Sequence, residues 1–253
     1  MAKVTTNRGK SPFRDKVGIR DEVVSYLNKF RTTVSFHGKK ISTYFEMNCY
    51  TYIVKFYERN GYTVQGVNLQ AGNRFKYKCT PAGIQSNFSF FSISKMDKGV
   101  KYSFEIHQNL GVQSSHDKEL FTNPDIIVIK SNTCEYTRMY YDTKTVFSFV
   151  KNENLISFFE VKNFHPFPEL LFNFIGVLNE LRKEVMINKG IEYLPIHLAP
   201  SLLISGKPNA PTLRIKKSLE SRYCINIIYD IFHSGVSTFS KNNLGKLKTT
   251  GKI

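Results

Sequence analysis

Cysteine is scarce in this sequence, and its few cysteines are far apart. The four residues, Cys49, Cys79, Cys134 and Cys224, form no CxxC pair and have no histidine nearby at a metal-ligand spacing. Zinc-binding folds and disulfide frameworks depend on such closely spaced sets. The spacing therefore argues against both classes, and we expect reduced thiols, as in a cytoplasmic protein.

Long apolar runs are also missing. A membrane-spanning helix needs about 18 to 20 consecutive apolar residues, and no stretch of the chain approaches this length. The opening residues, MAKVTTNRGKSPFRDK, contain no apolar segment of the kind found in a secretory signal. We expect neither a membrane protein nor a secreted one, and no membrane among its partners.

Several motifs that carry common enzyme chemistries are absent. The chain contains no GxxxxGK[ST], no GxGxxG after a strand, no GxSxG and no HExxH. The sequence therefore gives no support for a nucleotide hydrolase, a dinucleotide-dependent enzyme, a serine hydrolase or a zinc protease.

Positive charge is what the sequence has in excess. The 253 residues include 36 Lys and Arg against 20 Asp and Glu, a formal charge of +16, and 41% of them are hydrophobic, as in a folded globular protein. Residues 97–184 hold 12 acids and 10 bases, so the basic excess lies in the flanking parts. An excess of this size favours a polyanionic partner such as nucleic acid, because each neutralised phosphate releases a counterion.

The charge pattern predicts three regions. Residues 1–40 form a basic arm followed by a short helix, 41–235 form the folded domain, and 236–253, which contain lysines and no acid, form a basic tail. We expect Arg14 and Lys16 in the arm to contact a nucleic-acid backbone.

The folded domain is predicted to be an α/β domain with one mixed β-sheet flanked by helices. Apolar positions at helical spacing predict a helix over 42–60 that ends at Gly61, and a second helix of about five turns from Pro168. The intervening segments are rich in β-branched and aromatic residues, which predict strands. A loop predicted over 206–217 carries three further candidates for contacts with a nucleic-acid backbone: Lys207, Lys216 and Lys217.

One pair of central segments carries residues suited to metal-assisted hydrolysis. Asp125 precedes the apolar strand IIVIK, and Glu160-Val161-Lys162 closes the apolar strand that begins LISFF. Residues i and i+2 of a strand share a face, so Glu160 and Lys162 project side by side. The carboxylates of Asp125 and Glu160 are hard ligands that suit Mg²⁺, and a lysine beside them is suited to orienting a nucleophile or stabilising charge on a phosphate.

A second acid-x-Lys triplet, Asp142-Thr143-Lys144, keeps an alternative open. Such a triplet is expected about twice by chance in this composition, so the spacing alone does not discriminate. Asp142 and Lys144 lie in a polar, tyrosine-rich stretch, whereas Glu160 and Lys162 end a nearly continuous apolar strand. Surface charge at strand ends is the other explanation of the central pair.

The segments PDIIVI and SFFEVK, with a helix after them, resemble the PD-(D/E)xK nuclease superfamily and its restriction-endonuclease-like fold. The resemblance implies a core of a helix, a three-stranded hairpin sheet carrying the motif, a second helix and a further strand, here with an extra β-hairpin inserted near 131–150. It implies Asp125 and Glu160 as metal ligands, the Val161 carbonyl as a further ligand, and Lys162 as the catalytic lysine. It also implies Mg²⁺ as the cofactor, for which Mn²⁺ substitutes.

Four other polar residues are candidates for the same site. The first helix of this superfamily often contributes an acid, which makes Glu46 a candidate ligand, and a solvated first-turn glutamate is the equal alternative. Glu105, His107 and Gln108 share one predicted strand and are accessory candidates, with an exposed polar sheet face as the alternative.

Together these features predict a Mg²⁺-dependent endonuclease that hydrolyses phosphodiester bonds, with DNA favoured over RNA. An RNA nuclease and a catalytically inactive nucleic-acid-binding or assembly protein of the same fold are the alternatives. The sequence contains no recognisable motif for reading a nucleic-acid sequence, so we expect specificity to come from a homodimer or a protein partner. An effector of prokaryotic defence or of mobile-element processing would fit this description by analogy.

Overall fold

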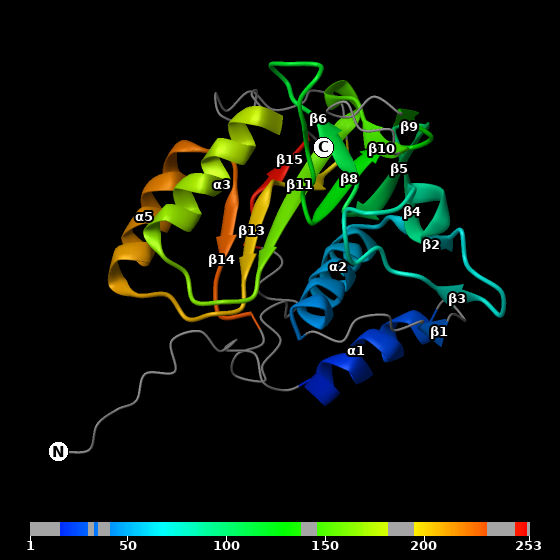
Figure 1. The fold of residues 1–253 in the computed structure, drawn as a ribbon, viewed down its shortest axis with the longest axis horizontal. Helices are drawn as coiled ribbons and strands as arrows, with labels where there is room; N and C mark the ends of the chain where they lie inside the picture. The colour runs from blue at the N-terminus through cyan, green and yellow to red at the C-terminus, as the bar shows by residue number, and fades with distance from the viewer. Residues whose placement is uncertain are drawn as a thin grey trace.

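The described chain forms three layers, with helices on both faces of a central mixed β-sheet (Figure 1). The computed structural model describes residues 16–29, 33–34, 41–137, 146–181, 195–231 and 246–251. None of the helices in these ranges has the length and apolar content needed to cross a membrane. The described helices, including two short 3₁₀ turns, are α1 (Lys16–Asn28), α2 (Ile41–Arg59), η1 (Gln85–Asn87), η2 (Asn152–Asn154), α3 (Pro168–Leu181) and α5 (Ala210–Arg222).

The central sheet has seven strands in the order β14-β13-β11-β8-β5-β4-β2. Neighbours from β2 to β11 run antiparallel, whereas β13 runs parallel to β11 and β14 parallel to β13. The sheet is therefore mixed, as predicted, and its direction changes at β11. Its strands are β2 (Thr63–Val67), β4 (Phe90–Asp97), β5 (Val100–Gln108), β8 (Ile126–Lys130), β11 (Leu155–Lys162), β13 (Ser201–Ile204) and β14 (Asn226–Ile228).

The remaining described strands form three smaller sheets, so the prediction of one sheet was incomplete. A turn at Asn109 redirects the chain after β5. The next segment, residues 111–113, leaves the central sheet and pairs with residues 149–150. The antiparallel pair of β9 and β10 confirms the hairpin expected near 131–150. The smaller sheets contain β1 (Thr33–Val34) with β3 (Arg74–Phe75), then β6 (Gly111–Gln113), β7 (Phe121–Thr122), β9 (Cys134–Thr137) and β10 (Phe147–Val150), and finally β12 (His197–Leu198) with β15 (Thr249–Thr250).

Two apolar cores hold the layers together. One lies between α2 and a face of the central sheet, with α1 packed outside, and includes Tyr50 and Phe159. The other lies on the opposite face, under α3 and α5, and includes Phe158 and Leu178. The adjacent residues Phe158 and Phe159 thus serve different cores, as strand alternation requires. Because β11 is covered on both faces, its sequence is almost continuously apolar.

The two long helices predicted from periodicity are present. α2 ends at Arg59, and Gly61 just beyond it adopts a left-handed φ of +79° that suits glycine. Residues 206–217, expected as a loop, instead lead into α5. Asn209 Oδ1 accepts a hydrogen bond from Thr212 N, and Thr212 Oγ1 accepts one from Asn209 N, which closes a capping box. The capping residues therefore outweigh the loop-like content of Pro, Gly and Lys.

Both predicted basic ends differ in part from expectation. α1 already begins at Lys16, so the last part of the predicted arm is helical. Arg14 and the side chain of Lys16 lie outside the described residues. At the other end, residues 246–251 are not a free tail, because β15 pairs with β12 and the Lys248 ammonium donates to two carbonyls at the end of α5.

Candidate active site

The structure brings together the three residues predicted as the catalytic set. β8 and β11 are antiparallel, and Ile126 pairs with Phe159, so Asp125 just before β8 lies beside the end of β11. The Lys162 Nζ lies 2.9 Å from Asp125 Oδ2 and 2.7 Å from Glu160 Oε2. Two carboxylates from separate strands therefore converge on one ammonium group.

The main chain also fixes this arrangement. The N–H of Val161 donates to Asp125 Oδ2 over 2.6 Å, which ties the Asp125 carboxylate to β11. The side chains of Lys162, Asp125 and Glu160 are 29%, 21% and 14% exposed, so the group is framed by protein and still reaches solvent. A ligand can therefore approach it.

A third carboxylate reaches this region from α2. Glu46 Oε1 accepts a hydrogen bond of 2.7 Å from Asn109 Nδ2, and Gln108 Nε2 lies 3.5 Å from the same oxygen. The charges of the Lys162 ammonium and of both other carboxylates act on Glu46. We call the resulting group the acid cluster: Glu46, Asp125, Glu160 and Lys162.

Asn109 links the parts of the acid cluster, and sequence reasoning missed it. Its main-chain N–H donates to the Asp125 carbonyl over 3.1 Å, and its Nδ2 donates both to Glu46 and to the Lys78 carbonyl, the latter over 2.8 Å. Asn109 adopts a left-handed φ of 47°, a conformation that asparagine tolerates better than most residues. The available signal was an asparagine at the end of a predicted strand, in EIHQNLG.

Three carboxylates lie around one lysine in the acid cluster, and the pKa values of Glu46 and Glu160 are raised there. Burial and the nearby Asp125 charge raise the pKa of Glu46 to about 8, and the hydrogen bond from Asn109 opposes part of the rise. Burial and Asp125 likewise raise the pKa of Glu160 to about 7. Burial alone would lower the pKa of Lys162, but Glu160 and Asp125 outweigh it and hold that pKa above its ordinary value. Lys162 therefore stays charged near neutral pH.

The oxygen atoms of the acid cluster suit a hard divalent cation. Mg²⁺ takes one or two protein carboxylates and keeps several waters. The raised pKa values of Glu46 and Glu160 mark an excess of negative charge that such a cation would neutralise. Asp125 and Glu160 would hold it, with the Val161 carbonyl as the further ligand that the resemblance implies. Within the described ranges no three His, Cys, Asp or Glu side chains form a metal-binding group, so the structure does not place Glu46 as a third ligand.

Glu105 and His107 lie apart from the acid cluster. Among the described residues they bond to each other, to Gln85 and to the Asn132 N–H, and not to a member of the acid cluster. Gln108 is the one accessory candidate that reaches Glu46. We call the separate group the Glu105–His107 network: Lys78, Gln85, Glu105 and His107.

The hydrogen bonds of this network run in one direction. Lys78 Nζ donates to Gln85 Oε1 over 3.2 Å, Gln85 Nε2 donates to His107 Nδ1 over 2.9 Å, and His107 Nε2 donates to Glu105 Oε2 over 2.9 Å. The second Glu105 oxygen accepts the main-chain N–H of Asn132 over 2.9 Å. This order assigns the neutral imidazole proton to Nε2, because Nδ1 accepts.

Burial closes the Glu105–His107 network to solvent. His107 is 2% exposed and stacks on the Phe90 ring, with 4.4 Å between ring centroids. Burial lowers the pKa of His107, despite Glu105, and lowers that of Lys78 to about 8. For Glu105, burial would raise the pKa, but the hydrogen bond and charge of His107 outweigh it and lower the pKa. Each polar group is thus matched inside the protein, as expected of a structural network.

Lys207 was predicted to contact a nucleic-acid backbone, and it lies at the same edge of the sheet as the acid cluster. β13 runs parallel to β11, so their carboxyl ends meet at one edge of the sheet. The N–H of Ser205 donates to the Lys162 carbonyl over 3.1 Å, and Lys207 follows two residues later, exposed to solvent.

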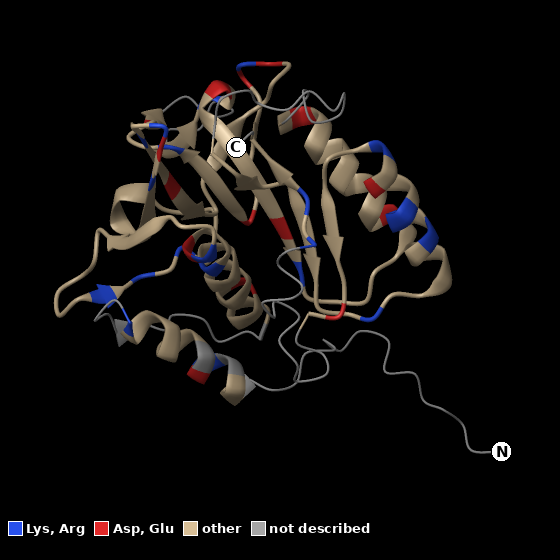
Figure 2. Ribbon diagram, turned by 180° about the vertical axis from the view of Figure 1, so that it is seen from behind, with Lys and Arg blue, Asp and Glu red and all other residues tan. Residues whose placement is uncertain are grey.

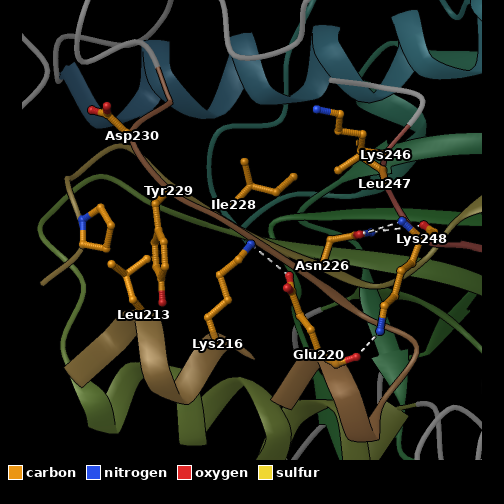
Figure 3. A pocket seen from close by; sticks show the side chains of 11 residues that line it. Leu213, Lys216, Glu220, Asn226, Ile228, Tyr229, Asp230, Lys246, Leu247 and Lys248 are labelled. Atoms are coloured by element: carbon orange, nitrogen blue, oxygen red, sulfur yellow. Dashed lines mark hydrogen bonds and ion pairs between the residues drawn. The ribbon is translucent and has the colours of Figure 1, made fainter. Parts of the chain in front are cut away.

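Lys216 lines a different hollow, of about 570 Å³, beside α5 and β14 (Figure 3). Its Nζ lies 3.0 Å from Glu220 Oε1 and also donates to the Ile227 carbonyl. Lys217 is exposed on the same helix, and Figure 2 shows several basic residues along it. The described residues that line this hollow include no member of the acid cluster, and the contacts of Lys216 go to Glu220, Ile227 and Tyr229, so Lys216 is engaged away from the acid cluster.

The alternative motif pair, Asp142 and Lys144, lies outside the described residues. Comparison with known proteins identified no relative: no family model, no curated protein and no solved structure matches the chain. The geometry of the acid cluster and the order of the elements therefore carry the functional argument alone.

Proposed function

We propose that the chain is a Mg²⁺-dependent nuclease of the PD-(D/E)xK superfamily, with Asp125, Glu160 and Lys162 as its catalytic residues. The observation that carries this proposal is the convergence of both motif carboxylates on the Lys162 Nζ, at 2.9 Å and 2.7 Å. Asp125 and Glu160 lie in separate segments of the chain, and an unrelated pair of charged strand ends would not be expected to meet in this way.

The order and direction of the elements support a restriction-endonuclease-like core. α2 precedes the antiparallel strands β5, β8 and β11, which carry the motif, and α3 and the parallel strand β13 follow. This is the order of helix, three-stranded hairpin sheet, helix and strand that the resemblance implies. The fold and the motif were expected together, so their agreement is more informative than the short motif alone.

The charge state of Lys162 favours one of its two expected roles. A metal ion, when bound, lowers the pKa of a water molecule and neutralises charge on the scissile phosphate. Because Lys162 stays protonated near neutral pH, it is suited to stabilising negative charge on the phosphate and poorly suited to accepting a proton. Asp125 positions it, since its carboxylate contacts both the Lys162 ammonium and the Val161 N–H.

Cleavage assays test the proposal directly. Plasmid, linear duplex and single-stranded DNA, and an RNA strand matched to the latter, are incubated with the protein and Mg²⁺ or Mn²⁺. We expect cleavage that EDTA abolishes and that Asp125→Ala and Lys162→Ala remove while circular dichroism stays unchanged. Lys151→Ala is the matched control, because it removes a lysine from an exposed ion pair with Glu135 instead.

Two results would contradict this assignment in different ways. Cleavage retained in both Asp125→Ala and Lys162→Ala would move the chemistry elsewhere, for which Asp142→Ala and Lys144→Ala test the alternative motif. Nucleic-acid binding without cleavage in any metal would favour the inactive binding protein of the same fold. Comparing cleavage of the matched RNA and DNA strands shows which nucleic acid is the substrate, and we favour DNA.

A further inference from the structure

Two phenylalanines directly after β11 are exposed to water. Phe164 and Phe167 lie in the turn between β11 and α3 and are 39% and 43% exposed. Their rings are stacked, with centroids 5.9 Å apart and planes inclined by 25°. Exposed aromatic surface is unfavourable in water, and a neighbouring pair of such rings marks a surface that binds something.

The turn that carries these rings is held in place by the end of β13. Ser205 contacts the residues just before the rings, through its N–H to the Lys162 carbonyl and its Oγ to Asn163 Oδ1 over 2.8 Å. Gly206 packs so closely that a Cβ there would lie 2.5 Å from the Phe164 carbonyl oxygen. The rings therefore stand on a backbone that is fixed before any ligand arrives.

The turn places the rings beside both the acid cluster and an exposed cation. Phe164 follows Lys162 by two residues, so their Cα atoms are at most about 7 Å apart. Lys207 follows Gly206, which touches the turn, and Lys207 is exposed. In Figure 1 the turn after β11 and the turn after β13 run side by side at the lower end of the sheet. Aromatic surface, positive charge and the acid cluster thus share one edge of the sheet.

We propose that Phe164 and Phe167 form a stacking platform for unpaired bases, and that the substrate of the acid cluster is a single-stranded nucleic acid. This inference rests on the proposed nuclease function. A flat aromatic pair binds the faces of bases, which are available in single strands and hidden in the stack of a duplex. Lys207 supplies the charge for the backbone of the same strand, and the formal charge of +16 makes a polyanion the favoured occupant of an apolar surface here.

The platform also fits the chemistry next to it. Phe164 and Lys162 are two residues apart, so a base stacked on Phe164 would belong to the same short stretch of strand as a phosphate at Lys162. Stacking tolerates every base, so this surface would fix the strand without reading its sequence. The absence of a recognisable sequence-reading motif is consistent with that behaviour.

Binding without divalent metal separates this inference from catalysis. The full chain is titrated, in EDTA, against a fluorescein-labelled oligothymidylate, an abasic strand of equal length and a duplex, and anisotropy is recorded. We expect Phe164→Ala/Phe167→Ala to weaken binding of the oligothymidylate by about 5- to 150-fold, the equivalent of one stacked base. Binding of the abasic strand and the duplex should not change. Tyr136→Ala is the matched control, since Tyr136 is exposed on β9, beyond the opposite end of β8 from Asp125.

Two further variants separate stacking from apolar contact and from misfolding. Phe164→Leu/Phe167→Leu keeps apolar side chains without flat rings and should also weaken oligothymidylate binding, whereas Phe164→Tyr/Phe167→Tyr should restore it. Equal binding by wild type and the alanine variant, or equal losses for all three ligands, overturns the platform. So does a change of oligomeric state in the leucine variant with unchanged binding, which assigns the surface to another protein copy. Each of these outcomes leaves the metal-dependent cleavage test unaffected.

Discussion

The acid cluster and the Glu105–His107 network contain similar groups in opposite states. Both bring carboxylate and nitrogen-containing side chains together. The acid cluster joins α2, the start of β8 and the end of β11, whereas Glu105 and His107 of the network lie on β5. In the acid cluster three carboxylates share Lys162, and side chains remain up to 29% exposed. In the network one carboxylate faces a neutral histidine and a main-chain N–H, and His107 is 2% exposed.

The difference shows why residue type alone does not identify a site. Burial, and after it the Asp125 charge, raise the pKa values of Glu46 and Glu160, and the acid cluster can therefore gain from a cation. Matched hydrogen bonds lower the pKa of Glu105 and leave nothing for a ligand to satisfy. The four predictions that follow test this contrast.

The largest expected contrast is in cleavage. Asp125→Asn should lower the single-turnover cleavage rate by about 100- to 1,000-fold, because it removes one charge of the pair of carboxylates proposed to bind the metal, at constant shape. Glu105→Gln makes the same chemical change in the Glu105–His107 network and should leave the rate unchanged. Equal losses in the two variants, with both folded by circular dichroism, would show that the network takes part in catalysis.

Stability should rank the same two variants in the reverse order. Glu105→Gln should lower the free energy of unfolding by about 1–3 kcal/mol, because His107 and the Asn132 N–H lose a charged acceptor in a closed site. Asp125→Asn should cost less, because it also removes a like charge beside Glu160 and Glu46. Urea unfolding at pH 7.5 in EDTA measures both, and a larger loss in Asp125→Asn would contradict the excess of negative charge assigned to the acid cluster.

The change of stability with pH should have opposite signs for the acid cluster and for the Glu105–His107 network. Glu46 and Glu160 hold protons in the folded state at pH values where the unfolded chain has released them, so metal-free stability should fall as pH rises from about 5 to about 8. Glu105, with a lowered pKa, contributes stability that is lost as pH falls below its ordinary value.

Thermal unfolding of wild type and Glu46→Gln across pH 4–9 measures this slope. Glu46→Gln should match wild type near pH 5 and exceed it at pH 8, because the amide is neutral throughout. Mg²⁺ at pH 8 should raise the melting temperature of wild type and not that of Asp125→Asn. A rising wild-type slope between pH 5 and pH 8 would refute the raised pKa values.

The smallest predicted effect concerns Asn109. Asn109→Gly keeps the left-handed φ of 47° and the main-chain bond to Asp125, but removes the hydrogen bonds to Glu46 and the Lys78 carbonyl. We expect cleavage to fall by about 10-fold, as for a residue that supports others. Loss of the hydrogen bond from Asn109 to Glu46 should also raise the pKa of Glu46 further. The fall in stability with rising pH should then extend to higher pH. An unchanged pH profile would assign Asn109 to the turn alone.

Much of the framework could be predicted from local sequence. The apolar strands before and within the motif, α2 ending before Gly61 and α3 starting at Pro168 all follow from periodicity and terminal residues. α5 was missed because its capping pair, Asn209 and Thr212, lies among Pro, Gly and Lys residues that are typical of a loop. The four-stranded sheet that contains β6 was missed because a left-handed turn redirects the chain at Asn109, which periodicity does not reveal.

The sequence by itself determined which residues are candidates for the proposed chemistry: an acid before one buried strand, and an acid and a lysine at the end of another. Strand alternation already places Glu160 and Lys162 on one face. Only the tertiary structure decided that Asp125 joins them, since antiparallel pairing of β8 with β11 is a non-local contact. It also decided that Glu46 and Gln108 approach each other at the acid cluster while Glu105 and His107 bond within a separate network, because the burial and the partners of a side chain depend on what packs around it.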